Sequence, residues 1–218
     1  MFTSVTPDLL LMAYRQGVFP MADHARAEEF NFYRPHIRAL LPIHTLHIPR
    51  RLIKTLKSHP YKVTIDKDFS RVIDLCAEET DTREISWINP GIRDIFKTLH
   101  KMGIAHSVEC WNEDGSFAGG LYGLEIGAVF CGESMVSTAR DASKIAFVHL
   151  CARLWKGGFT TLDTQFANPH LLQFGLYEMK QEDYEILIQT EMNKKADFAL
   201  AGMSEEKLLE EYLEFLKA

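Results

Sequence analysis

Residues 105–133 read AHSVECWNEDGSFAGGLYGLEIGAVFCGE, which is three apolar extended runs separated by two short turn-like segments. The runs cover 105–111, 117–124 and 128–133, and the turn residues between them predict two successive β-hairpins. A long helix is expected over Asp141–Trp155, and Thr160–Phe166 returns to an extended strand. Antiparallel strands followed by a helix and a further strand predict an α+β fold in two layers.

The flanking segments carry helix and strand signals of their own. Thr6-Pro7-Asp8 is a helix start, with an N-cap residue, a proline at the first helical position and an acid in the first turn. Further elements are expected in this order: a loop-rich stretch through Pro20, Pro35 and Pro42, a helix over His47–Ser58, a strand over Tyr61–Ile65, helices over Asp68–Ala77 and Asn89–Gly103, a short helix near Asn168, a helix or strand-helix mixture over Asp183–Met192, and an amphipathic tail over Met203–Leu216. We predict three units: a small basic N-terminal domain (1–60), a catalytic domain (61–192) and an acidic helical tail (193–218).

Length and composition exclude several classes of protein. The chain has 218 residues, of which 46% are hydrophobic, and no apolar run approaches the roughly 20 residues of a membrane span. The N-terminus lacks the pattern of a secretory signal. The four cysteines, Cys76, Cys110, Cys131 and Cys151, are far apart among apolar neighbours, which indicates reduced thiols. We therefore expect a cytoplasmic protein with no membrane partner, and a monomer.

One basic segment stands out in a chain whose net charge is −6. From Phe30 to Lys62 there is no Asp or Glu, whereas seven Lys and Arg residues occur there. Four of these cations fall at spacings that gather them on one side of the helix predicted over 47–58; they are Arg50, Arg51, Lys54 and Lys57. Such a segment either faces an anionic partner or is a solvated face balanced by acids elsewhere, and composition leaves both open.

Three polar residues near the strand ends are candidates for chemistry. Asp163 and Gln165 alternate along one strand and so point to the same face. They either form a site or make a solvent-facing row on an edge strand, and the pattern alone favours the row. Glu133 ends an apolar strand, where a carboxylate is expensive unless it is paired; Lys144 is its candidate partner, and a strand-end position in solvent is the alternative.

Several familiar sites are absent from the sequence. Gly132-Glu133-Ser134-Met135 lacks the pattern of a nucleophile elbow. His100 and His106 have no third ligand at metal spacing, so we predict no metal. No glycine-rich phosphate or dinucleotide motif occurs, and we predict no cofactor.

Many short motifs, taken together and in order, resemble those of the leucyl/phenylalanyl-tRNA–protein transferase family. They are Leu10-Leu11-Met12-Ala13-Tyr14-Arg15-Gln16-Gly17-Val18-Phe19-Pro20, Arg34-Pro35 through Arg38-Ala39, His47-Ile48-Pro49-Arg50-Arg51, Trp87-Ile88, His106-Ser107-Val108-Glu109, Gly119-Gly120-Leu121-Tyr122-Gly123, Phe130-Cys131-Gly132-Glu133-Ser134-Met135, Ala142-Ser143-Lys144 and Leu162-Asp163-Thr164-Gln165. The match runs from about Pro7 to about Ile188. Each piece is a modest signal, but so many in register are specific.

The resemblance implies a fold and a reaction. The fold would be an acetyltransferase-like (GNAT-type) mixed sheet flanked by helices, behind a small N-terminal domain, and working without coenzyme A. The reaction would move Leu, and less readily Phe or Met, from aminoacyl-tRNA to proteins that begin with Arg or Lys, marking them for N-end-rule degradation. The aminoacyl ester is already activated and the α-amine has a reference pKa of about 8, so the enzyme needs only to place two substrates, move a proton and stabilise an oxyanion.

The resemblance also assigns roles to residues. Gln165 would accept a hydrogen bond from the attacking amine, Asp163 would polarise or orient it, and Glu133 would help to position the aminoacyl ester or its amine. The candidates for the aminoacyl pocket are Leu121, Phe130 and Phe166. The candidates for tRNA binding are Arg50, Arg51, Lys54 and Lys57 against the acceptor stem, and Trp87 stacked on the terminal adenine.

The sequence also departs from the family, at Met21, where an aromatic residue is usual, at Val136, which replaces a Phe and would widen the pocket, and at Thr164. Two other functions remain alternatives: a coenzyme A-dependent N-acetyltransferase, and a non-catalytic adaptor that binds basic N-termini or tRNA.

Overall fold

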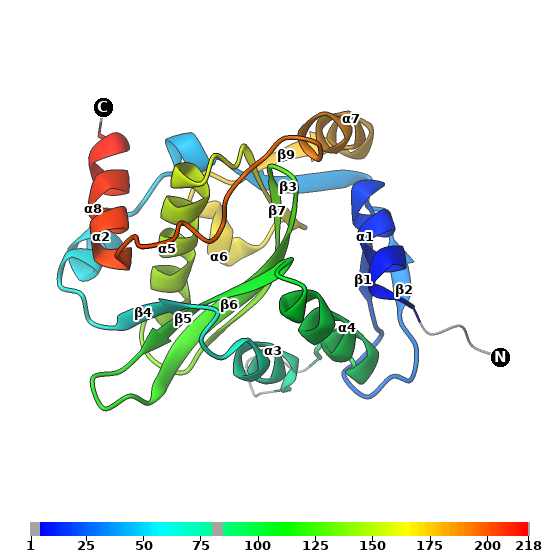
Figure 1. Cartoon of the computed structure of the whole chain (residues 1–218), viewed down its shortest axis with the longest axis horizontal. Coiled ribbons are helices and arrows are strands. Elements are labelled where there is room, and N and C mark those ends of the chain that lie inside the picture. The colour runs from blue at the N-terminus through cyan, green and yellow to red at the C-terminus, as the bar shows by residue number, and fades with distance from the viewer. Residues whose placement is uncertain (1–4, 80–84, 218) are drawn as a thin grey trace.

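A computed structural model describes residues 5–79 and 85–217 of the chain (Figure 1). Its strands are β1 Phe19–Met21, β2 Asn31–Tyr33, β3 Ile37–Leu41, β4 Lys62–Ile65, β5 Ala105–Trp111, β6 Phe117–Ile126, β7 Val129–Ser137, β8 Thr161–Gln165 and β9 Tyr177–Lys180. Its helices are α1 Pro7–Arg15, the 3₁₀ turn η1 Ile43–Thr45, α2 Arg50–Lys57, α3 Phe69–Ala77, α4 Pro90–Lys101, α5 Ala142–Lys156, α6 Pro169–Leu172, α7 Gln181–Glu191 and α8 Glu205–Phe215. Mixed helices and strands confirm the α+β class.

A seven-stranded mixed sheet organises the described residues, in the order β4-β5-β6-β7-β8-β3-β9. Neighbours pair antiparallel except β7 and β8, which pair parallel through only three residues of each strand. On β7 these are Val129, Phe130 and Cys131, whereas β7 continues to Ser137. Beyond Cys131 the two strands part, which opens the sheet at its centre.

Each face of the sheet carries its own apolar core because side chains alternate along the strands. Leu121 and Phe130 pack on the face covered by α5, α8 and α2, while Tyr122 and Cys131 pack on the face covered by α1, α3, α4 and α7 (Figure 1). Close approach of α5 depends on Gly119, since a Cβ there would lie 2.8 Å from the Cβ of Ala142. Gly119 therefore lets α5 press against β6, whereas Gly120 faces α3, where a Cβ would lie 3.4 Å from Val72 Cγ2.

Local capping explains where several helices begin. Thr6 accepts a hydrogen bond from the Leu9 amide at the start of α1, and Asn89 accepts one from the Ile92 amide at the start of α4. The side-chain amide of Asn89 also donates, through Nδ2, to the carbonyls of Ala27 and Glu29. This cap therefore connects the β1–β2 region to the main body.

Most expected elements are confirmed, with shifts at their ends. Strand β7 runs to Ser137 rather than stopping at Glu133, because its second half stays paired with β6 across a bulge. The loop-rich stretch contains three short strands that proline-interrupted runs of three to five residues do not reveal. One of them, β3, lies between β8 and β9 in the main sheet, so residues from the 1–60 segment help build it; the division near residue 60 stays a prediction.

The tail packs back on the body through α8. Arg153 of α5 donates to the carbonyls of Phe198 at 2.6 Å and Ala199 at 2.9 Å, and pairs with Glu205 at the start of α8. Among residues 5–79 and 85–217, no helix is long and apolar enough to cross a membrane.

Candidate active site

A cavity of about 770 Å³ fills the opening between β7 and β8. Its walls come from β7 and β8, from the neighbouring β6, from β1 and α5, and from the segment after β8. They include Leu121, Met135, Leu162, Glu133 and Gln165. A mostly apolar cleft with a few converging polar groups is the usual form of a small-molecule site. The site therefore arises from the divergence of the one parallel strand pair in the described sheet.

Asp163 lies behind the cavity wall, fully buried. Its Oδ1 accepts from Arg38 Nε at 2.8 Å and from the Gln165 amide at 2.9 Å, and its Oδ2 accepts from Arg38 Nη2 at 2.5 Å and from the Tyr184 hydroxyl at 2.7 Å. Four donors use the roughly four acceptor positions of a carboxylate. The acceptor positions of the Asp163 carboxylate are thus all used by protein donors. Its contact with Gln165 is to the backbone N–H of that residue.

Gln165 occupies a strained turn at the end of β8. Its φ is +60°, and the amide of Phe166 donates to the carbonyl of Thr164 at 2.7 Å, which closes a γ-turn centred on Gln165. Such a conformation costs a non-glycine residue of the order of 1–3 kcal/mol. The bond from the Gln165 amide to Asp163 holds the turn and directs the side chain to the cavity, where its Nε2 donates to Glu133 Oε1 at 3.2 Å.

Glu133 is the acid at the cavity wall. Its Oε1 accepts hydrogen bonds from the Tyr14 hydroxyl at 2.8 Å and from Gln165. Burial raises the pKa of Glu133 to about 8; the Tyr14 hydrogen bond opposes that rise, and the negative charge of Asp163 adds to it. A carboxyl with this pKa changes protonation state close to neutral pH, as a group that moves protons must.

Arg38 is the cation that allows Asp163 to be buried. Its guanidinium lies between the rings of Phe19 and Tyr184, at 4.7 Å and 4.4 Å from their centroids, and Nη1 donates to the carbonyl of Gly17. Tyr14 and Arg38 stand in the motifs of the resemblance, which implied no role for them, and Tyr184 stands in none of those motifs. A fully buried arginine and tyrosine around one carboxylate cannot be recognised before the strand order is known.

The predicted aminoacyl-pocket residues divide. Leu121 and Phe166 line the cavity, and Phe166 packs edge-on against Phe19 with ring centroids 5.4 Å apart. Phe130 lies apart from the cavity, in the core against Phe159 and Phe198. The sequence missed Met135 and Leu162, which line the cavity beside Leu121.

The predicted RNA-binding residues also lie in two places. Trp87 lines the cavity together with Phe19 and Met21. Arg50, Arg51, Lys54 and Lys57 are all exposed on α2, whose buried side is formed by Leu52 and Leu56. The basic helix thus presents its cations to solvent as the spacing predicted.

Two sequence interpretations are wrong. Asp163 and Gln165 do not form a solvent-facing row on an edge strand, because β8 lies between β7 and β3 and both residues are buried. Lys144 does not pair with Glu133; it donates to Asp141 at 3.0 Å, within the first turn of α5. The partners of Glu133 come instead from α1 and β8, far away in the sequence.

Comparison with known proteins identifies the family. Residues 40–189 match the family model described as leucyl/phenylalanyl-tRNA protein transferase, and residues 3–36 match the model of its N-terminal domain. Proteins named leucyl/phenylalanyl-tRNA–protein transferase are 46% identical in Hyphomonas neptunium (88% of this chain, 74% of that protein), 44% in Rhodopseudomonas palustris (90% and 87%) and 46% in Caulobacter vibrioides (88% and 88%). A solved structure titled "The structure of L-PGS from Bacillus licheniformis" aligns over 84% of this chain and 58% of its own at TM-score 0.41 and 12% identity, too distant to support any inference. The family models and the three relatives agree over most of the chain, and the chain belongs to the leucyl/phenylalanyl-tRNA protein transferase family, enzymes of the aminoacyl-tRNA–protein transferase class.

Proposed function

We propose that this enzyme moves a leucyl group, and less readily phenylalanyl or methionyl, from aminoacyl-tRNA to the α-amine of proteins that begin with Arg or Lys. Family membership supports the transfer itself. The apolar wall formed by Leu121, Met135 and Leu162 supports an aliphatic aminoacyl side chain. Such a wall separates apolar side chains by only about 1–3 kcal/mol per methylene, which suits a preference rather than strict selection.

The donor is placed by two contacts in this proposal. Trp87 stacks on the terminal adenine at the cavity, and the exposed cations of α2 hold the acceptor stem through its phosphates. This arrangement positions the RNA without reading its sequence. It leaves the ester carbonyl beside Gln165.

The chemistry then needs one bond formed and one broken. The acceptor amine attacks the ester carbonyl carbon, a C–N bond forms, the C–O bond to the tRNA ribose breaks, and the ribose hydroxyl leaves with a proton. Gln165 Oε1 accepts a hydrogen bond from the attacking amine while its Nε2 is held by Glu133. Glu133, with a pKa of about 8 that matches the reference pKa of an α-amine, takes up the amine proton, directly or through water, and returns it to the departing ribose oxygen.

Asp163 acts as a positioning residue. Its four hydrogen bonds come from Arg38, Tyr184 and the Gln165 amide, so it fixes the strained turn that aims Gln165 and does not contact the amine. The single observation that carries the proposal is this convergence of Gln165 and Glu133 at the wall of a mostly apolar cavity.

The test is transfer of labelled leucine from Leu-tRNA to a model protein that begins with Arg. We expect transfer by the wild type, a drop of about 100-fold or more in kcat for Gln165→Ala, and little transfer to the same protein beginning with Glu. Failure of the wild type to modify Arg or Lys N-termini would refute the proposed acceptor. Full activity of Gln165→Ala would keep the reaction and remove Gln165 from it.

Further points belong to the same proposal. The parallel pair that parts after Cys131 supports an acetyltransferase-like (GNAT-type) sheet with a small N-terminal unit before it. The enzyme works as a monomer in the cytoplasm, where its tRNA substrate is found.

A further inference from the structure

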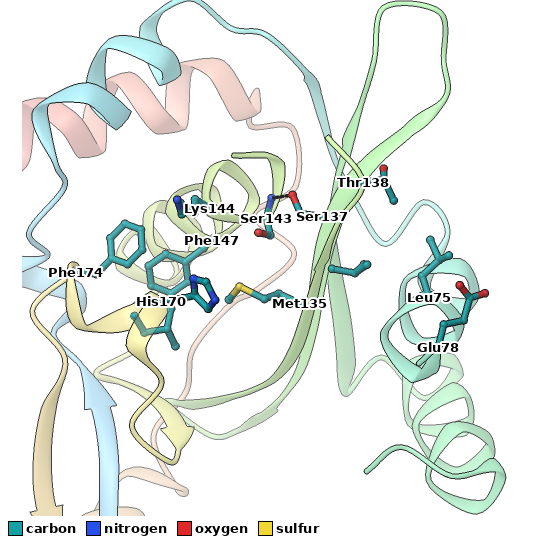
Figure 2. A pocket seen from close by; sticks show the side chains of 12 residues that line it. Leu75, Glu78, Met135, Ser137, Thr138, Ser143, Lys144, Phe147, His170 and Phe174 are labelled. Atoms are coloured by element: carbon teal, nitrogen blue, oxygen red, sulfur yellow. Dashed lines mark hydrogen bonds between the residues drawn. The ribbon is translucent and has the colours of Figure 1, made fainter. Parts of the chain in front are cut away.

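A second cavity, of about 340 Å³, adjoins the first along β7 (Figure 2). The two cavities share Met135, Phe147, His170 and Leu171. Trp87, on which we place the terminal adenine, lines the first cavity and not the second. A reaction between two large substrates needs two approaches to one carbonyl, and the paired cavities supply them.

The floor of the second cavity is a strand edge that, among residues 5–79 and 85–217, has no partner strand. Strand β7 pairs with β8 only from Val129 to Cys131. Farther along, Met135, Val136 and Ser137 of β7 pair with β6 on one side. The Thr138 amide donates to the Ala118 carbonyl at 2.9 Å, and the Val136 carbonyl lies against Gly119 of β6. Because main-chain groups alternate sides along a strand, Met135 and Ser137 turn their N–H and C=O groups away from β6, into the cleft.

The cavity also straddles that edge. Figure 2 shows Lys144, Phe147 and Phe174 on one side of the strand, and Leu75 and Glu78, from the end of α3, on the other. An added strand places successive side chains on opposite faces of a sheet. Space on both sides of a free edge is what an extended polypeptide requires.

We propose that the N-terminal segment of the acceptor protein binds as an extra strand along this edge of β7, with its α-amine at Gln165 and Glu133 and its following residues over Met135 and Ser137. This rests on the proposed function, which requires a polypeptide that begins at the reacting amine. The edge runs from Glu133 outward through the second cavity, so one strand spans both. Binding by strand addition draws its affinity from main-chain hydrogen bonds, which explains how one site serves acceptors of unrelated sequence beyond the first residue.

Charge favours a polypeptide over the RNA in this cavity. Among its described lining residues the one lysine, Lys144, already donates to Asp141, and an exposed acid, Glu78, lines the opposite side. Phosphates would therefore meet little free positive charge here, whereas the main chain of a polypeptide carries no net charge for Glu78 to repel.

The experiment uses Arg-initiated acceptor hexapeptides in which one backbone amide at a time is replaced by an ester, with the intact enzyme and Leu-tRNA. Removal of an N–H that faces the β7 edge is expected to lower kcat/KM by about three- to tenfold, and removal at the residues between to change it by less than about twofold. A flat profile with normal transfer to the unmodified peptide would overturn the strand, while no transfer to the unmodified peptide would overturn the proposed function instead.

Two variants of Ser137 test whether the β7 edge of the enzyme binds the peptide. Ser137→Pro removes an N–H that faces the cleft and leaves the β6 ladder intact, and Ser137→Ala removes the same hydroxyl contacts while keeping that N–H. With Ser137→Ala as the reference for loss of the hydroxyl, we expect Ser137→Pro, if its melting curve shows it folded, to raise KM for the peptide several-fold above that of Ser137→Ala, and the two variants to have the same KM for Leu-tRNA. A rise in KM for Leu-tRNA instead would mean that the RNA occupies this edge and would overturn the proposal. Should Ser137→Pro fail to fold, the ester series decides alone.

Discussion

The hydroxyl of Tyr14 donates a 2.8 Å hydrogen bond to Glu133 Oε1, joining the first helix to the centre of the sheet across 119 positions of sequence. Tyr14 is almost fully buried, and its partner Glu133 is half-buried at the cavity wall. The N-terminal helix α1 is therefore a structural part of the site.

Tyr14→Phe removes the hydrogen bond that opposes the rise in the Glu133 pKa, so this pKa should move above about 8. If ionised Glu133 takes up the amine proton, the rise of kcat with pH should move to higher pH by about one unit, with a lower kcat at pH 7. The kcat–pH profile from pH 6 to 10 measures it, with Tyr33→Phe, at an exposed tyrosine, as control. An unmoved profile would remove Glu133 from the proton transfer.

Glu133→Gln should make the protein more stable and less active. Burial raises the Glu133 pKa from 4.5 to about 8, so the folded protein holds a proton that the unfolded chain releases, and stability is lost as pH rises through this window. Glutamine does not ionise, so Glu133→Gln should avoid this loss, which is of the order of 2–4 kcal/mol in the free energy of unfolding above pH 8. Melting temperatures at pH 5 and pH 9 should show a gain of several degrees at pH 9 and little at pH 5. The exposed Glu210→Gln should show no such difference.

Arg38→Met should leave Asp163 buried without its cation, at a cost of about 3–5 kcal/mol in the free energy of unfolding. Arg38→Met with Asp163→Asn removes both charges and should recover much of that loss, because a neutral pair needs less compensation. Urea denaturation of the two single variants and the double variant measures the coupling. Additive losses would mean that the two groups do not depend on each other.

Gln165→Gly and Gln165→Ala separate backbone strain from side-chain chemistry. Both remove the carboxamide, but only glycine accepts φ = +60° without cost, so the glycine variant should be about 1 kcal/mol more stable than the alanine variant. Both should lose transfer activity to a similar degree. Equal stability in chemical denaturation would show that the γ-turn stores no strain.

Lys54→Ala combined with Lys57→Ala should raise KM for Leu-tRNA several-fold. The slope of log KM against the logarithm of salt concentration should fall by roughly 1.5. The control Lys101→Ala with Lys195→Ala makes the same change in net charge at exposed sites elsewhere. A minimal donor, the leucyl ester of adenosine, should be used equally well by both double variants. If that donor is affected too, α2 acts on the cavity and not on the acceptor stem.

Local patterns predicted much of this fold. Hairpin turns, the caps at Thr6 and Asn89 and the spacing of α5 depend on neighbours in sequence, and those elements lie where they were expected. The short strand β3 was missed, since five residues between prolines carry too little pattern.

Of the candidate site, the sequence predicted three polar residues but not the partners that hold them. The resemblance pointed to Glu133, Asp163 and Gln165, which the structure brings together. It could not reveal that Asp163 is saturated by Arg38 and Tyr184, or that Tyr14 holds Glu133, because these bonds depend on strand order rather than on spacing. Long-range packing likewise places Phe130 in the core beside Phe198, outside the cavity lining. Lys144 contacts Asp141 and not Glu133.

The insertion of β3 between β8 and β9 also bears on how the enzyme is made. Arg38 leaves the ribosome early, yet its partner Asp163 follows 125 positions later, and β9 completes the sheet beside it at Lys180. Contacts of such separation close late and slowly because a long loop must first be ordered. A nascent chain that ends before Leu171 lacks part of the cavity lining, so it cannot yet draw on the pool of charged tRNA that its own synthesis is using.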